Sequence, residues 1–202
     1  MTDRNGVVRI EIASNEEDYR NAVRLIESVI RRWYGCLPPE PPKTIVVAKH
    51  GSEVIGTSAL EFSNGEEPLS IESIYEFDRA RTPWPFDRPR IVQFGRWAAT
   101  MKDISGVLIY ASTVFALNHG KIWGVSEVKD RIAERFSELG VELRFITPAK
   151  LLLERISEDR RAYYVTPPRS RPCMVHLRQM ERALKPDALR LVSEGRVDLR
   201  IE

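Results

Sequence analysis

The sequence predicts an α/β (α+β) fold with a mixed, mostly antiparallel central sheet, helices on both faces, and a basic C-terminal extension of strand and helix. Two observations support this. Short alternating or apolar segments bounded by turn residues are typical of strands, and segments with helical spacing of apolar residues separate them. In order they read β-α-β-β-β-β-α-β-α-β before the tail, so antiparallel hairpins come first and α/β crossovers follow.

The expected elements follow one another along the chain with short connections. They are a strand at 7–13, a helix from Ser14 or Asn15 to about Trp33, two strands around HGSE within 44–63, a strand at 71–77, a loop at 80–90, a strand at 91–100, a helix within 101–120, a strand at 121–128, a helix at 128–140, a strand at 141–146, a short helix at 148–156, two strands around a Pro-rich turn within 160–179, and a helix at 179–195 with a break at Pro186.

Local chemistry justifies these boundaries. Residues 7–13 (VVRIEIA) alternate apolar and polar positions, and Ser14 or Asn15 supplies a cap oxygen before first-turn acids. The proline-rich GCLPPEPP ends the first helix. The apolar run at 104–117 is short for a membrane span and predicts a buried helix. Gly140 ends an amphipathic helix.

Composition sets the class of protein. The chain has 202 residues, 43% of them hydrophobic and 30% charged, with a net charge of +2. This predicts one globular domain, with a core at about 7–159 and an extension at about 160–202. A charge of +2 does not indicate nucleic-acid binding. Cys36, Cys173 and the scattered histidines do not predict a disulfide scaffold or a metal site. No signal peptide or transmembrane segment is recognisable, so a cytoplasmic protein is expected.

One stretch carries a family resemblance. RIVQFGRWAAT (90–100), an apolar helix, and KIWGVSEVKDRIAERFSELGVELRFI (121–146) occur in an order that resembles the GNAT acyltransferases. The GNAT pattern Y-x-x-L-G-F corresponds here to Phe136-Ser-Glu-Leu-Gly-Val. The resemblance covers roughly residues 7–145. It implies that pantetheine lies in a gap between two central strands, held by main-chain groups near Phe94–Trp97 through strand addition.

Two departures from the GNAT pattern indicate which branch of the superfamily the sequence resembles. Residues 101–106 lack the Gly-rich loop that wraps a CoA pyrophosphate, and Phe136 replaces the tyrosine that protonates a leaving thiolate. Both favour the branch that uses acyl carrier protein, which contains the acyl-homoserine-lactone synthases and the long-chain N-acyl amino acid synthases. The lactone synthases' E-x-x-R-F-A-V corresponds to Gln93-Phe94-Gly95-Arg96-Trp97, so the arginine matches and the glutamate does not. The N-acyl amino acid synthases, including the N-acyl tyrosine type, are therefore favoured.

The implied reaction is direct acyl transfer to an α-amine, which needs a base and an oxyanion site but no covalent enzyme intermediate. The predicted catalytic residues are Glu72, Gln93 and Arg96. Glu72, Glu76 or Gln93 through a water would assist deprotonation, with Glu72 favoured because it is expected on an adjacent strand, and Arg96 would bind a carboxylate. The alternatives are an exposed strand carboxylate for Glu72 and a structural ion pair for Arg96. No cofactor is expected to be permanently bound, because the phosphopantetheine thioester of the carrier protein brings the acyl group.

Binding residues are predicted in two groups. The acyl and pantetheine group is Phe94, Gly95, Trp97, Ile109 and Trp123, for which plain core packing is the alternative. The amino-acid group is Arg32, Trp33, Tyr34, Arg81 and Trp84, in or near loops, for which loop anchoring is the alternative.

The C-terminal segment carries a separate signal. Residues 160–202 contain ten Lys/Arg and five Asp/Glu, a net charge of +5, and leave −3 on the rest of the chain. A basic face including Arg178 and Arg182 suits docking of an acidic carrier protein. RNA, an anionic membrane or plain solvation of the helix are alternatives. For the whole protein, the alternatives to the N-acyl amino acid synthase are a CoA-dependent GNAT N-acetyltransferase with a degenerate loop and an inactive GNAT-like binding module.

Overall fold

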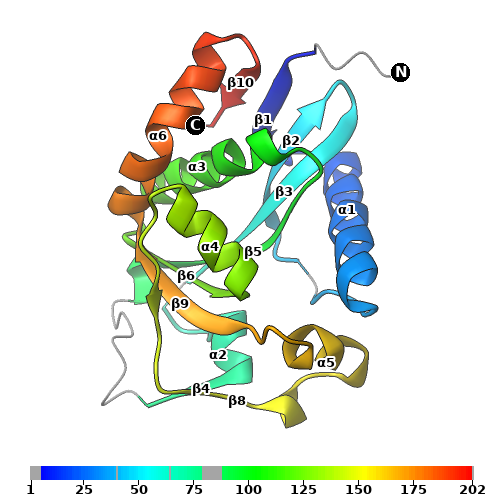
Figure 1. Ribbon diagram of the computed structural model, residues 1–202, viewed down its shortest axis with the longest axis vertical. Helices are drawn as coiled ribbons and strands as arrows, with labels where there is room; N and C mark the ends of the chain where they lie inside the picture. Colours follow the sequence, from blue (N-terminus) through cyan, green and yellow to red (C-terminus); the bar gives the residue numbers. More distant parts are fainter. Residues whose placement is uncertain (1–5, 40, 64, 79–87, 202) are drawn as a thin grey trace.

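The computed structural model describes residues 6–39, 41–63, 65–78 and 88–201 (Figure 1). Its elements are β1 (Val8–Ile12), α1 (Glu16–Tyr34), β2 (Thr44–His50), β3 (Glu53–Phe62), α2 (Ser70–Ile74), β4 (Tyr75–Phe77), η1 (Arg88–Arg90), β5 (Ile91–Ala99), α3 (Lys102–Asn118), β6 (Trp123–Val128), α4 (Asp130–Glu138), β7 (Arg144–Phe145), β8 (Ala149–Leu151), η2 (Leu153–Arg155), α5 (Glu158–Val165), β9 (Arg171–His176), α6 (Leu177–Ser193) and β10 (Val197–Arg200).

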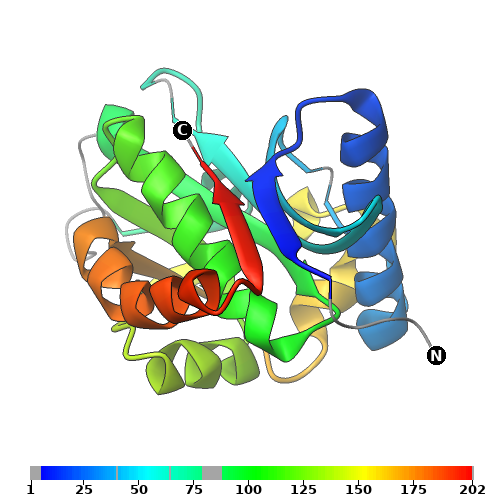
Figure 2. The same ribbon diagram turned by 90° about the horizontal axis from the view of Figure 1, so that it is seen from above.

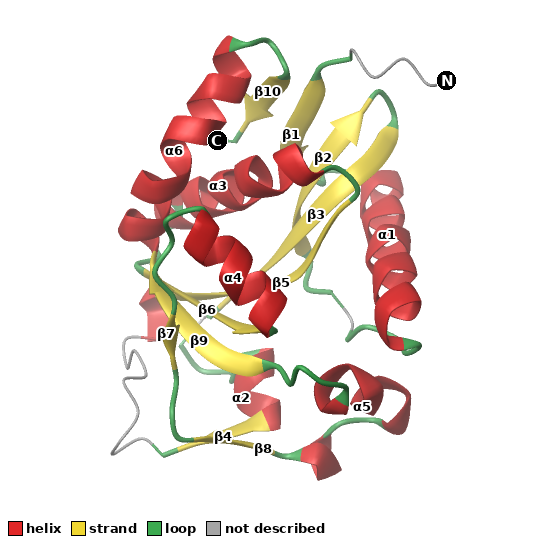
Figure 3. Ribbon diagram, in the orientation of Figure 1, coloured by secondary structure: helices red, strands yellow, loops and turns green. Residues whose placement is uncertain are grey.

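The main sheet has eight strands in the order β10-β1-β2-β3-β5-β6-β9-β7 (Figure 3). The β1–β10 and β5–β6 pairs are parallel, and the other pairs are antiparallel. The predicted mixed, mostly antiparallel sheet is confirmed. The basic C-terminal segment supplies two of its strands, β9 and β10, so it is built into the sheet.

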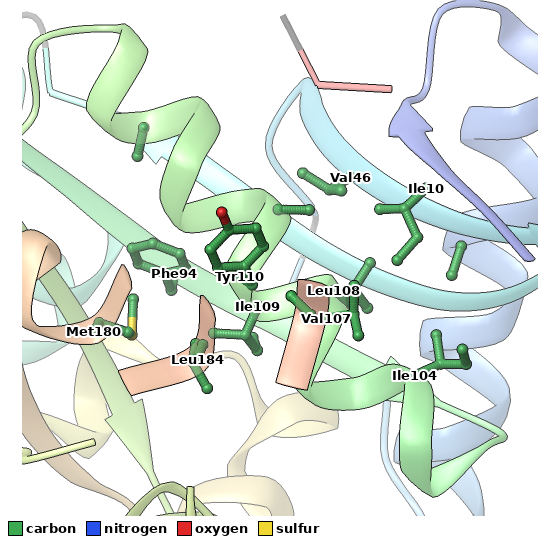
Figure 4. Packing of buried hydrophobic residues seen from close by; sticks show 14 of the residues in the cluster. Ile10, Val46, Phe94, Ile104, Val107, Leu108, Ile109, Tyr110, Met180 and Leu184 are labelled. Atoms are coloured by element: carbon green, nitrogen blue, oxygen red, sulfur yellow. The ribbon is translucent and has the colours of Figure 1, made fainter. Parts of the chain in front are cut away.

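Helices cover both faces, as predicted (Figures 1 and 2). The alternation of side chains along β2 shows how: Ile45 and Val47 pack in a cluster with Ala22 of α1, whereas Val46 and Ala48 belong to the larger core with α3. Helix α4 contributes Phe136 to that same larger core. Helix α6 contributes Met180 and Leu184 to it (Figure 4). Helix α3 is its central element and is apolar nearly all round, which is typical of a buried helix.

Two strand predictions are wrong because a helix forms instead. The segment 71–77 forms α2 and then only a short β4, since Glu72 accepts a hydrogen bond from the Leu69 N–H at 2.9 Å and caps the turn. The first of the two strands expected within 160–179 is α5. Its Tyr-Tyr-Val favoured a strand, but Glu158 and Asp159 in the first turn favour a helix start.

The opposite error occurs at 148–156. This leucine-rich segment forms β8, paired with β4, and the 3₁₀ helix η2, because the tertiary pairing overrides helix propensity. The expected break at Pro186 is absent, since α6 continues through it with the proline exposed to solvent. Strand β10 was not predicted at all. None of the helices in the described part of the chain has the length and apolar character needed to traverse a bilayer.

Candidate functional site

The two parallel central strands separate part-way along their length. β5 and β6 pair only at Ile91–Trp123, Val92–Gly124 and Gln93–Val125. Beyond this point β5 continues to pair with β3, and β6 continues to pair with β9. The Ser126 hydroxyl donates to the Phe94 carbonyl oxygen at 3.0 Å, just past the last ladder pair. The sheet is therefore split between the carboxyl-terminal parts of β5 and β6. This is the position that the family resemblance implied for pantetheine.

A bulge in β5 accompanies this split. Between Thr57 and Ala59 the register shifts, so that β5 carries one more residue than β3. Arg96 lies in the bulge with a φ of 51°, and among the described residues it is the one non-glycine with a positive φ. The Thr57 hydroxyl donates to the Arg96 carbonyl oxygen at 3.0 Å. The left-handed residue thus lies in the part of β5 that pairs with β3 and no longer pairs with β6.

Gly124 of β6 leaves room for the Phe94 ring of β5 to pack against it. A Cβ at Gly124 would come within 2.9 Å of the Phe94 ring and 3.1 Å of both Leu177 and Val175. Any larger residue would push the Phe94 ring out of its position. Gly124 is therefore required by the close packing at the floor of the split.

The split opens into a cavity of about 100 Å³. Its walls are mostly apolar and come from β3, β5, β6, β9, α3, α4, α5 and α6. The lining residues are Ser58, Phe94, Gly95, Arg96, Trp97, Ile109, Gly124, Val125, Ser126, Glu127, Val128, Ile132, Phe136, Leu143, Tyr163, Cys173, Val175 and Met180. An apolar slot with a few polar groups is the usual form of a small-molecule site.

Three of the polar groups in this wall are shielded from solvent. The Ser58 hydroxyl, the Trp97 indole N–H and the Glu127 Oε2 are buried, and no hydrogen-bond partner occurs for them within the described residues. Leaving such groups unpaired costs about 1–3 kcal/mol each. Each of the three therefore retains an unused capacity for a hydrogen bond.

Glu127 is the most unusual of these groups. Its Oε1 accepts a hydrogen bond from the Tyr164 hydroxyl at 3.3 Å. Burial raises the pKa of Glu127 to about 7, while Arg96, the Tyr164 hydroxyl and Lys129 act in the opposite direction. Burial of the Tyr163 and Tyr164 hydroxyls raises the pKa of both groups, and the nearby Glu127 carboxylate raises it further.

The structure brings five predicted residues together at the cavity. They are Phe94, Gly95, Arg96, Trp97 and Ile109. Tyr34, a predicted amino-acid contact, lies at the edge of this region. Its ring packs edge-on against the cavity residue Tyr163, with centroids 5.0 Å apart, and the Lys129 ammonium lies 4.5 Å from the Tyr34 ring.

Two predicted catalytic residues lie outside the cavity lining. Glu72 is in α2 and not on the expected adjacent strand, and its carboxylate is shared between the Leu69 N–H and the Arg88 guanidinium. The Gln93 side chain is buried and accepts a hydrogen bond from the Ile71 N–H at 2.9 Å. Gln93 thus ties α2 to β5, and Glu72 caps α2 and ties it to Arg88 of η1.

The remaining predicted residues are dispersed. Trp123 begins β6 and packs against the His176 ring in a separate core cluster. Trp33 is 58% exposed beneath the Arg131 guanidinium, and Arg32 is exposed beside it at the end of α1. Arg81 and Trp84 lie outside the described residues.

Glu127, Ser126 and Tyr163 were missed from the sequence. A signal for the first two existed, because they are adjacent polar residues in the otherwise apolar strand segment KIWGVSEV. Tyr163 gave no such signal, since α5 was predicted as a strand.

The basic surface is smaller than the sequence suggested. Several arginines of the C-terminal segment pair with carboxylates, as Arg171 does with Asp130 and Arg196 with Asp103. Arg178 and Arg182 are exposed one turn apart on α6, and the described residues give them no ion pair. Met180, on the same stretch of helix, lines the cavity.

No protein-family model matches the sequence, and neither does any curated protein sequence. Solved structures do match. The CoA-dependent acyl-homoserine lactone synthase BjaI, bound to SAM and isopentyl-CoA, has a TM-score of 0.61 and 16% identity over 98% of this chain and 95% of that chain. The acyl-homoserine lactone synthase LasI has a TM-score of 0.60 and 11% identity over 89% and 94%.

A third match is FeeM, an N-acyl amino acid synthase from uncultured soil microbes. It has a TM-score of 0.56 and 11% identity over 86% of this chain and 92% of that chain. At these identities the likeness concerns the fold, which agrees with the resemblance in the sequence. The chain therefore has the GNAT-like fold that these acyl-homoserine lactone synthases and FeeM share.

Proposed function

We propose that this protein is an N-acyltransferase that moves a fatty acyl group from a phosphopantetheine thioester to the α-amine of an amino acid. The split between β5 and β6 is the observation that carries the proposal. Past Gln93, β5 makes no ladder pair with β6, so the main-chain groups of Phe94–Trp97 that are not bonded to β3 have no partner strand on the β6 side. An extended pantetheine arm would lie there as an added strand.

The apolar wall would receive the acyl chain. The rings of Trp97 and Phe136 lie 5.5 Å apart between centroids with their planes tilted by 50°, and Ile109 and Ile132 lie in the same lining. A cavity of about 100 Å³ is smaller than the roughly 150 Å³ that accommodates benzene in an engineered protein. A long chain therefore requires lining side chains to move or must extend beyond the cavity. Each buried methylene then contributes about 0.8 kcal/mol of binding.

Arg96 would bind the carboxylate of the amino acid, since its guanidinium matches that group bidentately. The choice of tyrosine rests on the likeness to the N-acyl tyrosine synthases. Tyr34 and Tyr163 provide an aromatic edge beside the cavity against which such a side chain would pack.

Transfer would be direct, without a covalent enzyme intermediate. Cys173 lines the cavity, but burial, assisted by Glu127, raises the pKa of its thiol to about 12. A thiol is a poor nucleophile, so Cys173 does not suit acylation at neutral pH.

The proposed donor is acyl carrier protein. Arg178 and Arg182 would contact its acidic surface, close to the wall that Met180 contributes. Acyl-CoA is the second candidate donor, because it carries the same pantetheine thioester and BjaI uses a CoA thioester. A cavity that still reaches the split favours an enzyme over an inactive binding module.

The test is product analysis. The protein is expressed in a bacterium, and the organic extract is compared by mass spectrometry with extracts from cells carrying an empty vector or the Arg96→Ala variant. A ladder of acyl chains on one amino acid, present with the native protein and lost or strongly reduced with the variant, is the expected result. An extract identical to the empty-vector control, with soluble protein in the cells, would contradict the proposal.

A further inference from the structure

Glu127 has a position that an ordinary surface carboxylate does not have. It lies near the end of β6, where the sheet is split, and it lines the cavity between Arg96 of β5 and Tyr163 of α5. Its Oε1 is hydrogen-bonded by Tyr164 at 3.3 Å. Its Oε2 is shielded from bulk solvent and has no hydrogen-bond partner within the described residues. One carboxylate oxygen is thus held in place and the other remains available to a ligand.

Charged and titratable groups from each packed element surround this carboxylate. The groups that interact with it electrostatically are Arg96 of β5, Tyr163 and Tyr164 of α5, Cys173 of β9, Tyr75 of β4, and Lys129 in the turn into α4. Lys129 does not neutralise it directly, since its ammonium donates to the carbonyl oxygens of Thr166 and Pro168 at 2.8 and 3.0 Å. Burial raises the pKa of Glu127 to about 7, which suits exchange of protons near neutral pH.

We propose that Glu127 is the general base of the acyl transfer, taking a proton from the ammonium group of the acceptor through Oε2. This inference rests on the proposed function. The ammonium gives one proton to Glu127, which later passes it to water. The resulting amine attacks the thioester carbonyl, forming the C–N bond and breaking the C–S bond. The second nitrogen proton goes to the departing thiolate, so the products are an amide and a free thiol.

The geometry favours Glu127 over the bases predicted from the sequence. Both oxygens of Glu72 already have partners, in the Leu69 N–H and the Arg88 guanidinium, and Glu72 does not line the cavity. Gln93 is an amide without a basic lone pair, and its oxygen holds the Ile71 N–H.

The inference is tested with Glu127→Gln, which removes the base and keeps the shape. Glu134→Gln on the exposed face of α4 is the matched control. With acyl carrier thioester as donor, we expect Glu127→Gln to lower kcat/KM by about 100-fold at pH 7 and the control to stay within twofold. The acid limb near pH 7 that Glu127 sets should be absent in Glu127→Gln, whose rate should follow instead the deprotonation of the acceptor's own α-ammonium, with a pKa of about 8. Binding of a nonhydrolysable acyl-pantetheine should be unchanged.

A purely structural role would give a different pattern. Glu127→Gln would then lower the rate by one factor at every pH and would weaken donor binding. Activity of Glu127→Gln within twofold of the native protein from pH 6 to 9 would also overturn the inference, while leaving the acyl transfer itself established. No transfer by the native protein from either donor would overturn the proposed function, and the inference with it.

Tyr164→Phe gives a second test that does not depend on the folding of Glu127→Gln. The Tyr164 hydrogen bond favours the ionised carboxylate, so its loss should move the acid limb of the pH profile to higher pH. An acid limb that stays in place in Tyr164→Phe would contradict the role of Glu127.

Discussion

The Thr57 hydroxyl of β3 donates a 3.0 Å hydrogen bond to the carbonyl oxygen of Arg96, the residue at which β5 bulges. This bond ties the bulge to the neighbouring strand on the side away from the split. Because Arg96 and its neighbours Gly95 and Trp97 line the cavity, the shape of this wall depends on a local feature of two strands.

Thr57→Val removes that hydroxyl while nearly keeping the side-chain shape. We expect the free energy of unfolding to fall by about 1–2 kcal/mol, since the Arg96 carbonyl loses its partner in a buried site. Acyl transfer should fall with it as the bulge relaxes. Urea unfolding and initial rates measure both effects. Thr44→Val in β2 is the control, and an equal loss of activity there would argue against a specific role of the bulge.

Arg96 combines backbone strain with a proposed ligand contact. Its φ of 51° lies in the left-handed region, where a non-glycine residue costs about 1–2 kcal/mol. Arg96→Gly should therefore be more stable than Arg96→Ala by about 1 kcal/mol, as thermal unfolding would show. Both variants should raise the KM for the amino acid similarly. Equal stabilities would mean that the bulge relaxes in the alanine variant, and an unchanged KM would remove Arg96 from the acceptor site.

Glu127 should lower the free energy of unfolding in the pH range in which it would act as a base. Its pKa in the folded protein, about 7, lies above its value of 4.5 in the unfolded chain. Between these values the unfolded chain has lost a proton that the folded protein keeps, so stability falls as pH rises through this window. Glu127→Gln avoids this loss and should be more stable than the native protein by up to about 3 kcal/mol at pH 8. At pH 4 the difference should vanish. Urea unfolding at both pH values measures it, and a constant difference would contradict the raised pKa.

Arg178 and Arg182 provide the test of carrier docking. Replacing both with alanine should weaken binding of an acidic acyl carrier protein severalfold and flatten its dependence on salt. Arg20 and Arg24 are exposed one turn apart on α1, on the other face of the sheet, so their double alanine variant is a control of equal net charge. Titration calorimetry at two salt concentrations measures the effect. Equal weakening in both variants would indicate a general charge effect without a docking face.

Much of the fold could be predicted because its signals are local. The strand alternation at 7–13, the Asn15 cap of α1 and the left-handed Gly140 after α4 each lie within a few residues of sequence. The short elements could not be predicted in this way. α2 and β8 contain five and three residues, too few for a period to show, and β8 exists only because β4 pairs with it.

The site was predictable only in part for the same reason. β5 and its arginine could be aligned with a family pattern, so five predicted residues meet at the cavity. Glu127 and Tyr163 meet there because α5 folds against the end of β6, and that contact joins segments far apart in the sequence. Glu72 depended on an expected strand, and the helix that formed instead engages its carboxylate.

The most direct measurement is a crystal structure of the protein soaked with a nonhydrolysable acyl-pantetheine amide. We predict density for the pantetheine arm between β5 and β6, hydrogen-bonded to the main chain at Phe94–Trp97, with the acyl chain against Ile109 and Phe136. The amide carbonyl should lie near the Glu127 carboxylate, with a gap between the two groups that one amino group would fill. Density elsewhere on the protein, with this cavity closed by its own side chains, would contradict the account.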